Sequence, residues 1–214
     1  AQYHGNTIDA TSNWWGDANG PDAKGNPADT SGDSITGDVT FEPWADAEIN
    51  TDNPNPSLTS AKSIGTDGST TIDTGSTTVS SANIQSNAGG GGGGSVTTSV
   101  SNDVPSTGSQ SRQNLEEDVS SVDENAQVVS AVNINPSDTN VRDSSATLEF
   151  TLSRSNVGEP SNIRVVRFND ATGSYESLPT SVLSTTDSQV TVQAQTPGFS
   201  LFAIVETAES ATVS

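Results

Sequence analysis

The chain has 214 residues, of which only 29% are hydrophobic and 5% aromatic, so it contains less core-forming material than its length allows. It carries 27 acidic and 7 basic residues, which give a formal net charge of -20. A chain this acidic has no basic patch to displace counterions from phosphates, so nucleic acids and anionic membranes are disfavoured as partners. Cysteine is absent, which excludes disulfides and thiolate metal sites.

The acidic residues are spread over the whole chain, and the only lysines are Lys24 and Lys62. Adaptation to molar salt would explain this, because salt screens self-repulsion. Disorder is the alternative, but it does not explain acids inside the apolar segments. No signal peptide and no run of 18 apolar residues is present, so we expect no membrane span. Because Ala1 is not Met, we expect a processed or excised chain with any anchor outside it.

The distribution of aromatic residues predicts three parts. No aromatic side chain occurs between Trp44 and Phe150, and aromatic residues supply much of the area that a core buries. We therefore predict an all-β protein with a β-helix-like cap and strand module at residues 1–50, a low-complexity linker or stalk at 51–118, and a small β-sandwich at 119–214.

The first part alternates short apolar and polar positions around Ile8, continues through a polar loop from Asp17 to Gly37, and returns to apolar residues at Val39–Phe41. This pattern predicts a strand, a long loop and a second strand. Trp14 and Trp15 precede a glycine that permits a turn, so they suit a cap over apolar residues.

The segment Ile8–Gly16, with Gly20-Pro21 and Gly37–Trp44 after it, resembles the closing coil of right-handed parallel β-helix proteins of the pectate-lyase-like class. A β-helix needs several stacked coils to bury its faces, and only Ala1–Thr7 precede this segment. Either a larger β-helix lies upstream or the cap is used without one.

Residues 51–118 are rich in Ser, Thr and Gly and include the run Gly89–Gly94. Such a segment buries too little to offset its ordering entropy, which favours a flexible stalk. The alternative is a set of short strands completed by a partner, because apolar residues recur at intervals: Ile64, Ile72, Val79, Ile84, Val96, Val100 and Val104.

The third part begins with a possible helix at Asn114–Asn125, where Glu116 and Glu117 suit the first turn. Alternating apolar positions then predict six strands of a β-sandwich, at Ala126–Asn133, Ala146–Leu152, Ile163–Phe168, Tyr175–Leu178, Gln189–Ala194 and Ser200–Val205. Asn169–Gly173 and Thr196–Gly198 are expected to be hairpin turns.

Three segments carry a second resemblance: Arg164–Phe168, Tyr175–Thr180 and above all Thr196–Val205. They resemble the PGF-pre-PGF domain that archaeal surface proteins carry ahead of a C-terminal sorting signal. The resemblance implies a secreted, cell-surface protein of haloarchaeal or methanogen type, with any lipid-anchoring tail after Ser214.

Few residues suggest a chemical site. Asp17, Asn19 and Asp22 crowd one loop and could offer oxygen ligands to calcium, but their spacing fits no known calcium motif and favours a solvated acidic loop. Trp14, Trp15 and Trp44 could stack on sugar rings or pack inside a cap. His4 is the only histidine, so no His-based catalytic pair exists. We predict no catalytic residue, and no cofactor other than possible calcium.

These observations favour a non-enzymatic extracellular structural protein of an archaeal cell surface. We expect copies to associate by β-strand addition into a filament or sheath, through Ile64–Ile84 or Val96–Val104. Surface polysaccharide or a cell-surface layer is a further possible partner. The alternatives are the C-terminal remainder of a carbohydrate-acting β-helix enzyme and a carbohydrate-binding or adhesive module. Upstream coils with clustered carboxylates, Arg or Lys would favour the enzyme.

The net charge of -20 predicts that folding depends on high salt. In dilute buffer, unscreened repulsion between carboxylates opposes the compact state, whereas molar KCl removes it. Circular dichroism during dilution from multimolar KCl measures this dependence. A cooperative β-rich fold that survives dilution unchanged would contradict haloadaptation.

Overall fold

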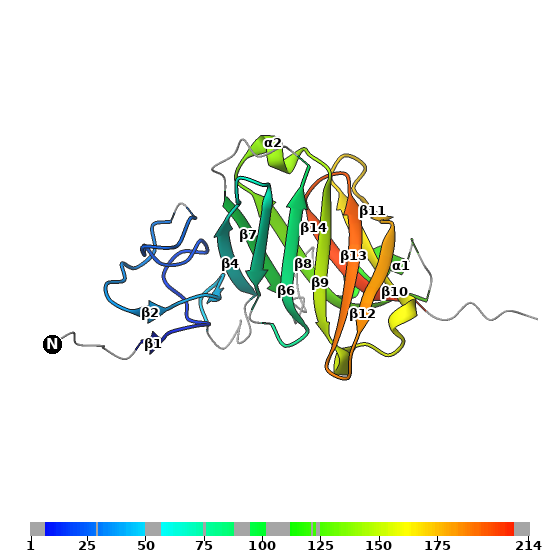
Figure 1. Ribbon diagram of the computed structural model, residues 1–214, viewed down its shortest axis with the longest axis horizontal. Coiled ribbons are helices and arrows are strands. Elements are labelled where there is room, and N and C mark those ends of the chain that lie inside the picture. Colours follow the sequence, from blue (N-terminus) through cyan, green and yellow to red (C-terminus); the bar gives the residue numbers. More distant parts are fainter. Residues whose placement is uncertain are drawn as a thin grey trace, which may run out of the picture.

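The computed structural model describes residues 7–28, 30–49, 57–74, 76–87, 95–101, 112–120, 122 and 125–207. Over these residues the predicted all-β class is confirmed, because strands dominate and the helices α1 (Arg112–Ser120) and α2 (Thr139–Arg142) are short. None of the described helices has the length and apolar character needed to cross a bilayer. Figure 1 shows a small N-terminal module beside two layers of strands.

Two antiparallel sheets form these layers. The seven-stranded sheet has the order β11 (Ser174–Ser177), β10 (Ile163–Asn169), β14 (Leu201–Glu206), β8 (Gln127–Pro136), β7 (Ser95–Ser101), β4 (Leu58–Ser63) and β3 (Trp44–Ala45). The five-stranded sheet has the order β12 (Thr180–Thr185), β13 (Gln189–Thr196), β9 (Ala146–Ser153), β6 (Val79–Ser86) and β5 (Ser69–Asp73). The N-terminal module adds the parallel pair β1 (Ile8–Asp9) and β2 (Val39–Thr40).

The linker expected at residues 51–118 is corrected by the structure over the residues that it describes. Strands β4, β5, β6 and β7 all lie within this range, and they belong to the sandwich. β6 pairs with β9, and β7 pairs with β8, so the partner that completes these strands is the C-terminal part of the same chain. The hexaglycine and Val104 lie outside the described residues.

The core explains why a Ser- and Thr-rich segment can form strands. From Ala82 to Ser86 every second residue of β6 is buried, and Ala82 and Ile84 lie in the core with Ile72 of β5 and Val96 of β7. The C-terminal strands supply the larger side chains. Phe150 of β9 and Phe202 of β14 meet across the two layers with ring centroids 6.4 Å apart. The aliphatic inward side chains of residues 57–101 thus pack against the aromatic and aliphatic side chains of the C-terminal strands.

A second apolar cluster lies on the outer face of the seven-stranded sheet. Leu115 and Val119 of α1 pack there against β8, β10 and β14, on the residues Val128, Ala131, Val166, Ala203 and Val205. The last strand therefore buries both faces. Phe202 and Ile204 belong to the inner core with Phe199, whereas Ala203 and Val205 face α1.

Three details of the C-terminal part differ from the sequence expectation. The helix ends at Ser120, earlier than the predicted Asn125. β12 was not predicted, because nearly all of its residues are exposed and its sequence shows no apolar alternation. Thr196–Gly198 does not form a hairpin, since β13 and β14 belong to different sheets and this turn crosses between them. The turn at Asn169–Gly173 does join a hairpin, formed by β10 and β11.

Replacing Ile84 by alanine should test whether residues 57–101 are structural. Its side chain is 1% exposed, so Ile84→Ala should lower the free energy of unfolding by roughly 2–5 kcal/mol. Thr71→Ala, at an exposed position of β5, is the matched control and should change it by less than about 0.5 kcal/mol. Chemical denaturation in high salt measures both, and equal small effects would return this segment to the role of a linker.

Candidate functional site

The N-terminal module is built around a parallel strand pair. Ile8 N–H donates to the carbonyl of Asp38 at 2.9 Å, and Ala10 N–H donates to that of Thr40 at 2.8 Å. A parallel bridge also joins Asp22 and Ser34 within the long loop. Parallel strands require a long crossover connection, which the loop between β1 and β2 provides. The local geometry is that of a single coil.

Trp44 lies at the centre of this coil and is fully buried. Its indole Nε1–H donates to the carbonyl of Ala18 at 2.9 Å, and Phe41 lies 6.3 Å away between ring centroids. Gly20 crosses the face of the indole so closely that a Cβ there would lie 2.5 Å from Trp44 Cε2. Trp44 therefore packs the coil, and in this position its ring cannot stack on a sugar.

Trp14 and Trp15 are half-buried at the same module. The carbonyl of Trp15 accepts from Asp33 N–H at 2.7 Å, so the backbone beside the ring closes the loop. Trp15 Nε1 is buried and has no hydrogen-bond partner. A role for these two rings in carbohydrate contact stays a prediction.

The acidic residues of the loop are engaged in local hydrogen bonds. Asp17 accepts from Asn19 N–H at 2.8 Å and from the Ser31 hydroxyl at 2.6 Å. These bonds lower the pKa of Asp17, the largest effect coming from the Ser31 hydroxyl. Asp22 accepts from the Ser34 hydroxyl at 3.1 Å. Among the described residues, no three His, Cys, Asp or Glu side chains are arranged to hold a metal ion.

A hydrogen-bonded junction joins the module to the sandwich. β3 pairs antiparallel with β4, with Trp44 opposite Thr59 and Ala45 opposite Leu58. On the module side, Ala45 N–H donates to the carbonyl of Asn13 at 3.1 Å. The residue pair Trp44–Ala45 thus belongs to both the coil and the seven-stranded sheet.

Side chains reinforce this junction. Lys62 Nζ of β4 lies 2.9 Å from Glu42 Oε2, and the other carboxylate oxygen of Glu42 accepts from Ala61 N–H at 3.4 Å. The lysine is 47% exposed, so the ion pair itself contributes little in water. Asp46, which directly follows β3, is partly buried, and this burial raises the pKa of the Asp46 carboxyl above its ordinary value.

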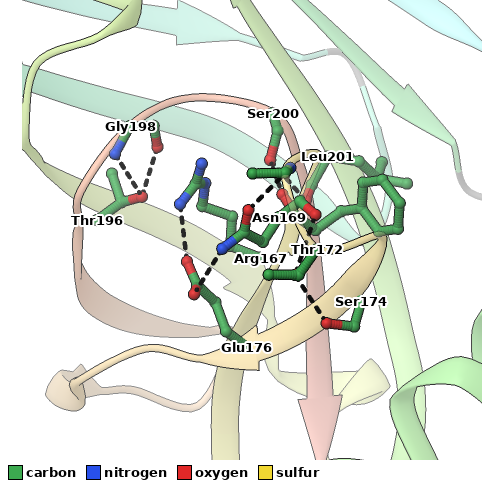
Figure 2. A network of polar contacts seen from close by, with 11 residues as sticks. Arg167, Asn169, Thr172, Ser174, Glu176, Thr196, Gly198, Ser200 and Leu201 are labelled. Carbon is green, nitrogen blue, oxygen red and sulfur yellow. Dashed lines mark hydrogen bonds and ion pairs between the residues drawn. The ribbon is translucent and has the colours of Figure 1, made fainter.

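A polar network that the sequence did not reveal closes one end of the sandwich (Figure 2). Arg167 Nη1 donates to Glu176 Oε1 at 2.7 Å, and Asn169 Nδ2 donates to Glu176 Oε2 at 3.3 Å. Arg167 and Glu176 are cross-strand neighbours on β10 and β11. The turn around Gly198 passes over the guanidinium, and a Cβ there would lie 3.6 Å from Arg167 Nη2. From the sequence, this ion pair could have been predicted only from the register of the β10–β11 hairpin, which places Arg167 opposite Glu176.

Comparison with family models and with curated proteins identifies no relative. No family model matches the chain, and a search of curated proteins finds no match. The two resemblances noted from short segments therefore have no support from these searches.

Gly20 offers a test of the packing around Trp44. Gly20→Ala adds a Cβ against the indole at a residue with φ of +83°, so it combines backbone strain with overpacking. Gly16 has φ of +84° and open space around it, so Gly16→Ala carries the strain alone. Hydrogen exchange of residues 8–45 should be faster in the Gly20 variant than in the Gly16 variant. Equal rates would mean that the ring does not press on this glycine.

Asp46 gives a pH-dependent prediction. Because its pKa is raised in the folded state, the ionised carboxylate lowers the stability of the fold at neutral pH, and this loss disappears as the pH falls below the ordinary aspartate range. Asp46→Asn should therefore raise the melting temperature at pH 7 and leave it unchanged below about pH 4. Glu48→Gln, at an exposed position of the same segment, controls for loss of one negative charge. Equal shifts in both variants would contradict the burial effect.

Proposed function

We propose that the chain is a non-enzymatic structural module of an extracellular surface protein, in which a β-helix-like cap is attached to a β-sandwich. The observation that carries this proposal is the junction at Trp44–Ala45, where one short strand serves the coil and the sheet together. A module held by backbone pairing keeps a fixed direction relative to its neighbour, as a structural spacer requires.

Two features of the sandwich support association between copies. The five-stranded sheet ends in β12 and β5, each paired on one side only. β12 has no ionisable side chain, and it exposes Val182 and Leu183 to 36% and 50%. An uncharged apolar edge is a favourable place for strand addition in a chain of net charge -20, because repulsion between copies is smallest there.

The two open edges only partly match the segments first expected to mediate assembly: β5 lies within Ile64–Ile84, whereas β12 lies outside both expected segments. β6 and β7 lie inside the sheets with a partner on both sides, so they have no open edge to add to a second copy. β5 and β12 do, and joining the β12 edge of one copy to the β5 edge of the next would repeat without closure. This arrangement yields the filament or sheath that we propose for the assembled protein.

Leu183→Lys tests this assembly. A lysine on an edge strand opposes pairing with another chain, so the variant should sediment as a monomer in high salt where the wild-type chain forms larger species. Gln195→Lys places the same charge at an exposed position of β13, which is paired on both sides, and should assemble normally. Electron microscopy of the same samples shows the form of the assembly. A wild-type chain that remains monomeric at every concentration would rule out the filament.

A further inference from the structure

A pocket of about 290 Å³ opens beneath α2, where β8 and β10 end and β14 begins. Asn133 and Asn135 of β8 line it, together with Arg142 of α2 and Asp170 of the turn after β10. Its apolar lining includes Leu201 of β14, the strand next to β8, and Phe168 of β10, the strand beyond β14. It lies beside the polar network that contains Asn169, Ser200 and Leu201 (Figure 2). The volume is at the lower end for ligand sites, which suits a ligand of one ring.

The polar side chains of the pocket have donors and acceptors that are free to bond a ligand. Arg142 donates from Nε and Nη2 to the carbonyl of Pro136, at 3.3 and 2.9 Å. These bonds fix the plane of the guanidinium and use two of its five N–H groups. Within the described chain, no hydrogen bond engages the side-chain amides of Asn133 and Asn135 or the carboxylate of Asp170. Planar donors and acceptors thus surround one space without saturating one another.

The apolar lining is held in place by its neighbours. Phe168 is half-buried and meets Tyr175 edge to face, with ring centroids 5.3 Å apart. Its carbonyl accepts from the Ser200 hydroxyl at 2.6 Å, which ties the end of β10 to the start of β14. An aromatic ring and a leucine side chain therefore form a fixed apolar surface beside the polar groups.

This combination of groups defines the ligand chemistry. A pyranose ring presents C–H groups on its faces and hydroxyls around its edge, which match an apolar surface bordered by amide, guanidinium and carboxylate groups. The single positive charge of Arg142 is balanced by Asp170, and the chain as a whole has a net charge of -20. An acidic sugar would be repelled, whereas a neutral one would not.

We propose that this pocket binds one neutral pyranose residue of a glycan. The site is independent of the structural role proposed above, since it involves neither the Trp44 junction nor the sheet edges. It also uses none of the tryptophans of the N-terminal module.

The test is titration of the full chain in high salt, followed by NMR chemical shifts of backbone amides. The probes are methyl β-D-glucopyranoside, methyl α-D-mannopyranoside and methyl β-D-galactopyranoside, with methyl β-D-glucuronide as the charged counterpart. At least one neutral glycoside should give saturable shifts centred on residues 133–135, 168–170 and 199–201, and the glucuronide should bind more weakly.

Asn133→Ala should weaken that binding roughly fivefold or more, the effect of losing one hydrogen bond. Asn83→Ala, on the outer face of the opposite sheet, should leave the binding unchanged. Arg142→Lys should also weaken binding, because lysine lacks the planar fork, and circular dichroism checks the fold of each variant. Absence of saturable shifts with all three neutral glycosides would overturn the proposal, as would equal binding by the two Asn variants or preference for the glucuronide. Failure of the filament test leaves this result unaffected.

Discussion

The structure depends on the pairing of β6 with β9 and of β7 with β8, which joins the strands of residues 57–101 to those of residues 127–207. Residues 57–101 contribute aliphatic core side chains, such as Ile72 and Ile84, and residues 127–207 add the aromatic ones, Phe150 and Phe202 among them. Neither set fills a sandwich alone. Interleaving them places strands from both segments in each layer, so a chain with 29% hydrophobic residues still encloses a continuous core.

The sequence predicted the parts of the fold whose side chains alternate clearly. Apolar residues recur along β8, β9, β10, β13 and β14, and all six expected strands are present, whereas β12, which lacks this pattern, was not expected. In residues 57–101 the apolar alternation is weak, because Ser, Thr and Ala occupy many of the positions, so a linker was the favoured prediction there. Composition alone makes such a segment resemble a linker, since its burial depends on residues such as Phe150 that lie far away in the chain.

The candidate sites were predictable to different degrees. For Trp44 the sequence left packing in a cap and stacking on a sugar both open, and the closeness of Gly20 to its ring, which decides between them, depends on the three-dimensional fold. The pocket beneath α2 was not predictable, because Asn133 of β8, Arg142 of α2 and Phe168 of β10 are brought together only by the sheet order β10-β14-β8. Asn133 and Asn135 alternate with buried neighbours as any outward-facing residues would. Nothing in their local sequence marks a site.

The interleaved order of strands also affects how the protein is made. β4 to β7 leave the ribosome before β8 and β9, so β6 and β7, which can pair with β5 and β4, each keep one unpaired edge until the later strands emerge. These contacts span long sequence separations, such as Asn83 with Glu149, and pairing of this kind forms slowly. During that interval the sparse apolar content and abundant hydroxyl groups of residues 57–101 become an advantage. A segment with little to bury has little tendency to aggregate while it waits for its partner strands.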